Sequence, residues 1–279
     1  MEAEYNKRSE KQVVKSTRYP NTITTLKRDF KTLGVRPGIV LIAHSSLSKI
    51  GWTVGGPVAV INALMQILTS EGTLVMPTFS SDNTDPSHWE NPPVPESWWN
   101  TIRNEMPAYH PDITPTRGMG SIVETFRKWP NIIRSNHPTS SFTAWGKYAE
   151  IITKNHELLA DLGEDSPLAR IYELDGYILL LGVSYENNTS LHLAEYRSDY
   201  FKKRYKLNGS AILVDNERQW AEWEELDLNM DDFEQLGKDF ESKINYVPVK
   251  VGIADARLLS QRELVDFAIE WFKENRTAM

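Results

Sequence analysis

The stretch IVLIAHSSLSKIGWTVGGPVAVINALMQILTSEGTLVMP, residues 39–77, decides the fold class of this 279-residue chain. Its uninterrupted apolar run at 39–43 is the pattern of a strand that is buried on both faces. Pro57 suits the first turn of a helix that ends near Leu68, and a second apolar strand follows at 72–77. A strand, a helix and a strand within about forty residues form a βαβ unit, which predicts a parallel pair of strands.

Helices and strands continue to alternate outside this unit. Helical periodicity and short apolar runs distinguish the two kinds of element. We expect helices at 22–33, 122–126, 149–154, 168–174 and 227–243, and a last one after the capping-box pattern at 260–263. We expect strands at 140–146, 176–183, 204–214 and 249–253. The sequence therefore predicts an α/β fold, with a central mixed, partly parallel sheet flanked by helices and a C-terminal antiparallel β plus helix elaboration.

One long segment, residues 78–116, interrupts the alternation. It is rich in Pro, Asn and Asp and carries three Trp residues, at 89, 98 and 99. A loop of this length in a compact domain is usually functional or disordered, and the Trp residues favour an ordered segment that faces a substrate. The chain has no internal repeat or linker, so we expect a single domain over residues 19–279, preceded by a flexible arm at 1–18.

Composition narrows the possible classes of function. The absence of Cys removes disulfides, thiolate metal sites and a cysteine nucleophile. The formal net charge of -7 disfavours nucleic acid and permits a cationic small substrate. No run approaches the ~18 apolar residues of a membrane span, and residues 1–11 lack the apolar core of a secretory signal. We expect a cytoplasmic monomer or homodimer without nucleic-acid or membrane partners.

His192 and Glu195 form a candidate acid–base pair just after the predicted strand at 176–183. Residues three apart on a helix share one face. A carboxylate there can hold the imidazole in one tautomer and stabilise its protonated form. The carboxyl end of a strand is also where open α/β sheets bind ligands. Because a single His-x-x-Glu pair is common, the pair alone leaves a structural role open.

A second candidate site follows the first strand. Residues 44–51 supply hydroxyls and free amides, and the helix start at Gly55 and Gly56 is suited to bind phosphate. Arg117, beside Gly118, would add a further phosphate contact. A plain helix cap and tight turn is the alternative interpretation. Together these residues predict a phosphate-bearing cofactor across the strand ends.

Several better-known catalytic motifs are absent from the chain. It has no Gly-x-x-x-x-Gly-Lys-Ser/Thr loop, no Gly-x-Gly-x-x-Gly, no Gly-x-Ser-x-Gly and no His-Glu-x-x-His. No two of its six His stand at ligand spacing. We therefore expect no metal, although a site built from scattered His with Asp85 or Glu195 stays open.

A series of short motifs, in order between about residue 20 and residue 200, resembles the aminoglycoside 3-N-acetyltransferase family of antibiotic-modifying enzymes. The matching residues are His44 through Ser48, Val54 through Gly56, Gly72 through Pro77, Arg117 through Gly120, Ser135 through Pro138 with Ser141, Phe142, Ala144 and Gly146, Ser166 through Leu168, and Thr189 through Glu195. The C-terminal third resembles the family only loosely.

The resemblance implies direct transfer of acetyl from acetyl-coenzyme A to the 3-amine of a 2-deoxystreptamine aminoglycoside or a related amine. In it His192 would be the general base, Glu195 its orienting partner and Thr189 an oxyanion donor. The implied coenzyme A contacts are His44, Ser45, Ser46, Leu47, Ser48, Lys49, Gly51, Gly55, Gly56, Thr78, Arg117, Gly118 and Met119. Candidates for binding the cationic amino sugar are Asp82, Asp85 and Glu186, for which solvated loop residues are the simpler interpretation.

Two other functions use the same residues. A metal-dependent hydrolase would combine His192 and Glu195 with further His or Asp side chains and would contain stoichiometric zinc. A binding protein on the same fold would bind the amine tightly without turnover. Metal analysis and calorimetry separate these alternatives from an acetyltransferase.

Overall fold

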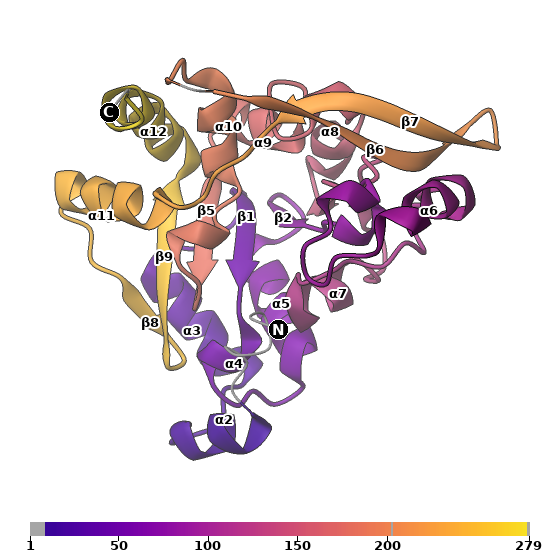
Figure 1. Cartoon of the computed structure of the whole chain (residues 1–279). Helices are drawn as coiled ribbons and strands as arrows, with labels where there is room; N and C mark the ends of the chain where they lie inside the picture. Colours follow the sequence, from indigo (N-terminus) through magenta and orange to yellow (C-terminus); the bar gives the residue numbers. More distant parts are fainter. Residues whose placement is uncertain (1–8, 202, 278–279) are drawn as a thin grey trace.

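A seven-stranded mixed sheet lies at the centre of the computed structural model, which describes residues 9–201 and 203–277 (Figure 1). The strand order is β3-β4-β2-β1-β5-β9-β8. The parallel core consists of β2 (Thr73–Pro77), β1 (Val40–Ser45) and β5 (Tyr177–Leu181). The antiparallel outer strands are β3 (Ile133–Arg134), β4 (Phe142–Gly146), β9 (Ala254–Ser260) and β8 (Val249–Val251). The predicted fold class is confirmed.

The predicted βαβ unit forms, and it sets the position of the site. Helix α5 (Gly56–Leu68) carries Pro57 in its first turn and connects β1 to β2 in parallel register. The next parallel strand, β5, pairs with the opposite edge of β1. The connection after β1 therefore runs to one side of the sheet, toward β2, and the connection after β5 runs to the other, toward β9 and β8. Such a topological switch point opens a crevice at the carboxyl ends of the two strands, where open α/β sheets bind ligands.

Helices cover both faces of the sheet because alternate side chains of each strand point to opposite sides. Leu41 and Leu179 pack with α3 (Ile23–Leu33), α5 and α7 (Gly120–Phe126). Ile42 and Ile178 pack against the helices of the other face. Those helices are α8 (Ala149–Thr153), α9 (Pro167–Glu173), α10 (Ser190–Arg197), α11 (Phe233–Ile244) and α12 (Gln261–Asn275).

Two strands in the C-terminal third were not expected as separate elements. One is β7 (Glu217–Leu226), which forms a hairpin with β6 (Tyr205–Val214). Asp215 and Asn216 join them with φ of 51° and 64°, the left-handed geometry of a tight hairpin turn. Half of the residues in β7 are charged, so its sequence lacks the apolar alternation that predicts a strand. The other is β9, which lies between β5 and β8. Helix α11 also begins later than expected, at Phe233.

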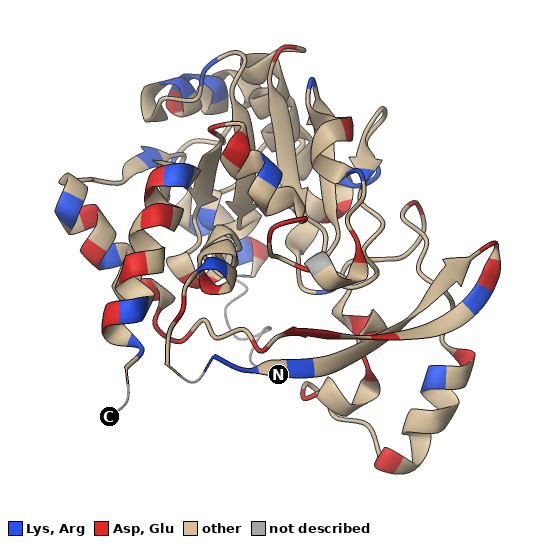
Figure 2. Ribbon diagram, turned by 90° about the horizontal axis from the view of Figure 1, so that it is seen from above, with Lys and Arg blue, Asp and Glu red and all other residues tan. Residues whose placement is uncertain are grey.

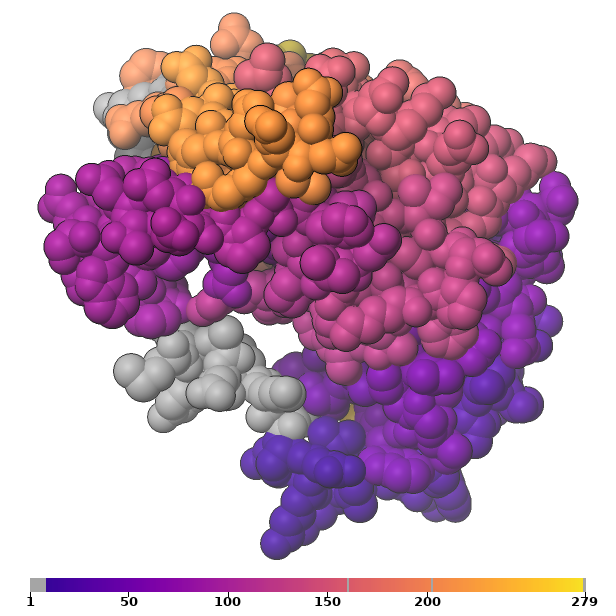
Figure 3. Space-filling view, turned by 90° about the vertical axis from the view of Figure 1, so that its right-hand side faces the viewer, coloured from indigo at the N-terminus to yellow at the C-terminus, as the bar shows by residue number. Residues whose placement is uncertain are grey.

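The long segment 78–116 is ordered by buried polar contacts. It contains η1 (Ser81–Asn83), η2 (Pro86–His88), η3 (Glu96–Trp98) and α6 (Trp99–Glu105). Buried Arg134 donates to the carbonyl oxygens of Thr78 at 2.7 Å and Thr114 at 2.6 Å. The β6–β7 hairpin packs on the segment, where the Tyr109 N–H donates to Ala211 O at 2.9 Å (Figure 3). The segment 78–116, predicted as a loop, therefore has a defined conformation.

The expected N-terminal arm, residues 1–18, contains a helix in its described part. Helix α2 (Glu10–Ser16) has a capping box between Ser9 and Gln12, and its Val13 is buried. Residues 1–8 lie outside the described residues. Three short helices complete the fold, α4 (Leu47–Ile50), η4 (Leu158–Ala160) and η5 (Tyr185–Asn187). Within the described ranges, none of the helices has the length and apolar character that crossing a membrane requires.

Candidate active site

A cleft of about 1370 Å³ opens at the carboxyl ends of β1 and β5, the switch point of the sheet. Its walls come from the residues after β1, from Gly182 to Ser184 after β5, from the start of α7 and from α2. The crevice that the strand topology requires is therefore present.

The loop after β1 crosses directly over the end of β5. The Ser46 N–H donates to Leu181 O at 3.0 Å, which ties the loop to the strand. Gly182 has a φ of 69°, and a Cβ there would lie 2.7 Å from the Cβ of Lys49. Only glycine combines this backbone conformation with so close an approach. The loop that carries the predicted cofactor residues is thus fixed against β5.

His192 and Glu195 form a buried pair on α10. The His192 Nδ1 lies 2.6 Å from Glu195 Oε2, and the two residues are 5% and 0% exposed. Nδ1–H must donate because a carboxylate oxygen accepts, so Nε2 carries the lone pair of the neutral imidazole. His192 Nε2 has no hydrogen-bond partner among the described residues. The arrangement is that of a general base with its orienting carboxylate.

The second oxygen of Glu195 is also occupied. Arg276 Nη1 donates to Glu195 Oε1 at 2.6 Å, and the Asn229 N–H donates to the same oxygen at 3.2 Å. Arg276 follows α12, which packs beside α10 (Figure 1). Arg276 is not among the predicted site residues, because no local pattern in the sequence links it to Glu195.

Thr189 and His44 meet beside this pair. Thr189 begins α10, but its side chain does not cap the helix; Asn188 Oδ1 accepts from the Ser190 N–H instead, at 3.2 Å. The Thr189 hydroxyl lies 3.5 Å from His44 Nε2. Burial, together with the nearby His192, lowers the pKa of His44 to about 3. His44 is therefore a neutral imidazole at physiological pH.

Most of the predicted coenzyme A residues line the cleft. These are Ser45, Ser46, Leu47, Ser48, Lys49, Gly51, Gly56, Gly118 and Met119. The other four predicted coenzyme A residues do not line the cleft. His44 is buried beside Thr189, Gly55 precedes α5, the Thr78 hydroxyl bonds to Ser141 O at 3.1 Å, and Arg117 pairs with Asp82.

The three acids predicted for the amino sugar lie in different environments. Glu186 lines the cleft, and Asp82 is exposed in its pair with Arg117. Asp85 is buried; burial by itself would raise its pKa, but hydrogen bonds from Arg103 and Ser87 outweigh burial and lower the pKa to about 2. Its carboxylate joins η2 to α6 through Arg103 at 2.7 Å. Asp85 is therefore already fully engaged within the protein.

Two further acids, buried Asp161 and half-buried Glu225, were not singled out from the sequence. Asp161 interacts electrostatically with both His192 and Glu225, and burial raises the pKa of both carboxyls. Asp161 Oδ2 accepts from the Tyr196 hydroxyl at 3.3 Å, whereas Oδ1 is buried without a partner within the described chain. Glu225 belongs to the acidic run of β7, which is red in Figure 2. A run of charge in the sequence gives no sign that one member is half-buried beside Asp161.

His137 and His156 are two further buried imidazoles, and His156 holds the backbone of Asp161. The His156 Nε2–H donates to the backbone oxygen of Asp161 at 2.6 Å, and the Ser135 hydroxyl lies 3.0 Å from His156 Nδ1. The His137 Nδ1 accepts from the Ser140 N–H at 3.0 Å. Burial lowers the pKa of His137 to about 4. Over residues 9–201 and 203–277, no group of three His, Asp or Glu is arranged to hold a metal ion.

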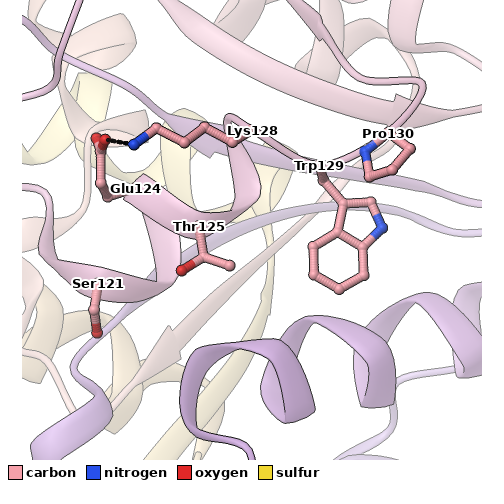
Figure 4. Close-up of a pocket in the computed structure, with 6 residues that line it drawn as sticks. All are labelled: Ser121, Glu124, Thr125, Lys128, Trp129 and Pro130. Atoms are coloured by element: carbon pink, nitrogen blue, oxygen red, sulfur yellow. Dashed lines mark ion pairs between the residues drawn. The ribbon is translucent and has the colours of Figure 1, made fainter.

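A smaller cavity of about 440 Å³ lies on the outer side of α7 (Figure 4). Glu124 and Lys128 form an ion pair of 2.8 Å there, and Trp129 and Pro130 close the cavity beyond the helix end. None of the residues that line it belongs to the His192–Glu195 pair. The pair does not line the larger cleft either; His44, the neighbour of the cleft residue Ser45, lies 3.5 Å from the hydroxyl of Thr189 at the start of the helix that carries the pair.

Comparison with known proteins gives consistent matches. The family model described as aminoglycoside 3-N-acetyltransferase matches residues 42–273. The chain is 48% identical, over 95% of its length and 97% of the relative, to the SPbeta prophage-derived aminoglycoside N(3')-acetyltransferase-like protein YokD of Bacillus subtilis. The crystal structure of YokD superimposes with a TM-score of 0.92 over 95% of this chain and 98% of that chain.

Two further solved structures contain ligands. AAC-VIa bound to sisomicin is 28% identical, with a TM-score of 0.84 over 93% of this chain and all (100%) of that chain. AAC-IIIb in a binary complex with CoASH is 27% identical, with a TM-score of 0.83 over 94% of this chain and 99% of that chain. Similarity to both extends over nearly the whole fold.

Proposed function

This chain belongs to the aminoglycoside 3-N-acetyltransferase family, and on that premise we propose that it transfers acetyl from acetyl-coenzyme A directly to a primary amine of an amino sugar. One observation carries the proposal: a buried His192–Glu195 pair with an unpartnered Nε2, on a helix whose first residue, Thr189, contacts His44 at the strand ends that form the large cleft. The Bacillus subtilis relative is named only as acetyltransferase-like, so the acceptor amine is part of the proposal.

The geometry accounts for each proton in the reaction. An amine of ordinary pKa is protonated at pH 7, and His192 Nε2 takes a proton to free its lone pair. The amine nitrogen attacks the thioester carbon, the C–O π bond opens, and the C–S bond then breaks to release the coenzyme A thiolate. The second N–H proton passes to the thiolate as the amide forms, and His192 releases the proton that it took to solvent, which restores the neutral imidazole. Glu195 stabilises the imidazolium while His192 holds its proton.

The Thr189 hydroxyl is the proposed oxyanion donor. It is free of helix capping and lies at the start of α10, one turn before His192. The neutral His44 next to it fixes the hydroxyl without adding a charge that would compete with the oxyanion. Donors positioned before the charge develops stabilise a transition state by a few kcal/mol, about 3 for one donor.

The cleft fits coenzyme A in size and chemistry. Its volume of about 1370 Å³ is sufficient for an extended ligand, and the Ser45 hydroxyl is buried beside it without a partner among the described residues. Gly56, at the N-terminus of α5, and Gly118, before α7, would present backbone amides to pantetheine or phosphate oxygens. Lys49 lines the same wall and would offset phosphate charge.

Two carboxyl groups, of Asp161 and Glu225, would favour a cationic acceptor. Asp161 interacts electrostatically with Glu225 and also with His192. A cation placed beside them would compensate the cost of burial and ionise both groups. We propose that they, more than Asp82 or Asp85, draw an amino sugar toward His192.

The test is an acetyl-coenzyme A assay that reads free thiol against a panel of aminoglycosides and simpler amines. We expect amine-dependent thiol release, a loss of at least about 100-fold in His192→Ala, and coenzyme A binding by calorimetry that survives the substitution. His110→Ala, at a half-exposed His, is the matched control. Full activity in His192→Ala, or no response to any amine, would overturn the proposal. Loss of activity with a chelator would favour the metal-dependent hydrolase.

A further inference from the structure

Arg276 connects the buried pair to a second carboxylate. Its Nη1 lies 2.6 Å from Glu195 Oε1, while its Nε and Nη2 each lie 2.7 Å from Asp232. Nη2 also donates to Asn229 O at 2.8 Å. All three guanidinium nitrogens are thus engaged, and the side chain is 11% exposed.

Aromatic rings hold the guanidinium in this orientation. Its central carbon lies 4.0 Å from the ring centroid of Phe272 and 4.8 Å from that of Tyr200. The Arg276 backbone oxygen accepts from the Phe201 N–H at 3.1 Å. A planar guanidinium stacked on rings and paired bidentately loses little freedom when it forms hydrogen bonds. Three separate segments of the chain therefore hold Arg276 in contact with Glu195: Phe272, residues 200–201 and residues 229–232.

We propose that Arg276 is a positioning residue that sets both the orientation and the basicity of His192 through Glu195, an inference that rests on the proposed acetyl transfer. Glu195 is fully buried, and a buried carboxylate without a countercharge is strongly disfavoured. If Arg276 were absent, the uncompensated Glu195 carboxylate would favour the protonated form of His192. The fixed cation lets Glu195 stay ionised while His192 stays neutral and able to accept a proton.

No other described group near the pair takes this role. His44 and Asp161 interact with His192, and Tyr200 and Lys203 interact with Glu195. Lys203 Nζ already donates to the backbone oxygens of Tyr196 at 2.7 Å and Ser198 at 3.0 Å. Asp232 is negative and faces Arg276 itself. Arg276 is the cation in direct contact with the Glu195 carboxylate.

Loss of the Arg276 charge changes the basicity of His192 in a predictable direction. In Arg276→Met the uncompensated Glu195 attracts the His192 proton more strongly, which favours the protonated imidazole. The limb of kcat/KM that reports the free base then moves to higher pH. Arg276→Lys keeps the positive charge but loses the bidentate geometry of the guanidinium. The basic limb of the kcat/KM profile therefore stays near its wild-type pH, while kcat falls.

The experiment titrates His192 by NMR in the full-length protein and follows kcat/KM from pH 5.5 to 9.5. We expect the upward shift in Arg276→Met and in Arg276→Gln, which offers a second route if the first variant folds poorly. Arg262→Met, on the same helix and paired with exposed Asp175, is the matched control and should show no shift. A folded Arg276 variant that leaves the His192 pKa unchanged overturns the inference. The NMR result does not depend on turnover, so it separates this failure from a failure of the proposed reaction.

Discussion

Glu195→Gln tests whether the orientation of one imidazole controls catalysis. In the wild-type protein Glu195 Oε1 accepts from Arg276 and the Asn229 N–H, and Oε2 accepts from His192. Glutamine offers only one oxygen. The two donors on the Arg276 side, one of them charged, will hold that oxygen, so the amide NH₂ will face His192 Nδ1. His192 must then carry its proton on Nε2 and has no lone pair for the amine.

The expected loss follows from general-base catalysis, which contributes about 10²–10⁴ in rate. The corresponding increase in barrier is about 3–5 kcal/mol. The volume of the side chain and its burial are unchanged, so the melting temperature should fall by only a few degrees. The chemistry and the fold are therefore separable in this variant.

The measurement is kcat for thiol release with the best amine of the panel, at pH 7.5, beside a calorimetric binding curve for coenzyme A. Glu164→Gln serves as the control because Glu164 pairs with Arg197 on the surface and its side chain is 62% exposed. A Glu195→Gln enzyme that keeps kcat within about threefold of wild type would refute the tautomer argument.

Three further substitutions test what supports the site. His137, with a pKa lowered by burial from 6.5 to about 4, gives stability that is complete above pH 6.5 and falls by up to about 3 kcal/mol toward pH 4. His137→Gln should flatten that slope in urea titrations, and an unchanged slope contradicts the assignment. Arg134→Met should cost about 3 kcal/mol and open the segment 78–116 to trypsin, because the Thr114 carbonyl loses the Arg134 donor and the Thr78 carbonyl keeps only the Ser141 hydroxyl; resistance to the protease would count against it. Gly237→Ala would place a Cβ 2.1 Å from the Tyr185 ring, so we expect a melting temperature lower by several degrees, and no decrease would show that the ring can move.

Local patterns predicted much of the fold. Helix α3 begins after Thr22 and ends at Gly34, whose φ is 107°, as the periodicity and the glycine indicated. Strands β1 and β2 follow from apolar runs that have no polar face. These elements were predictable because their stabilising contacts lie within a few residues along the chain.

Elements stabilised by distant partners were not predicted. Strand β7 is charge-rich and is a strand because it pairs with β6. The last strand, β9, is defined by its place between β5 and β8. Helix α6 forms in a segment that the buried Arg134 and the hairpin hold together. Propensity is a weak guide where tertiary contacts decide the conformation.

The candidate site divides in the same way. The sequence by itself determined that His192 and Glu195 share a helix face after a buried strand, because a spacing of three residues fixes that geometry. Only the tertiary structure decided that Arg276, far along the chain, neutralises Glu195, and that Asp161 is buried near His192. Contacts of that kind depend on how helices pack and on what burial excludes from water, and no short pattern in the sequence records either.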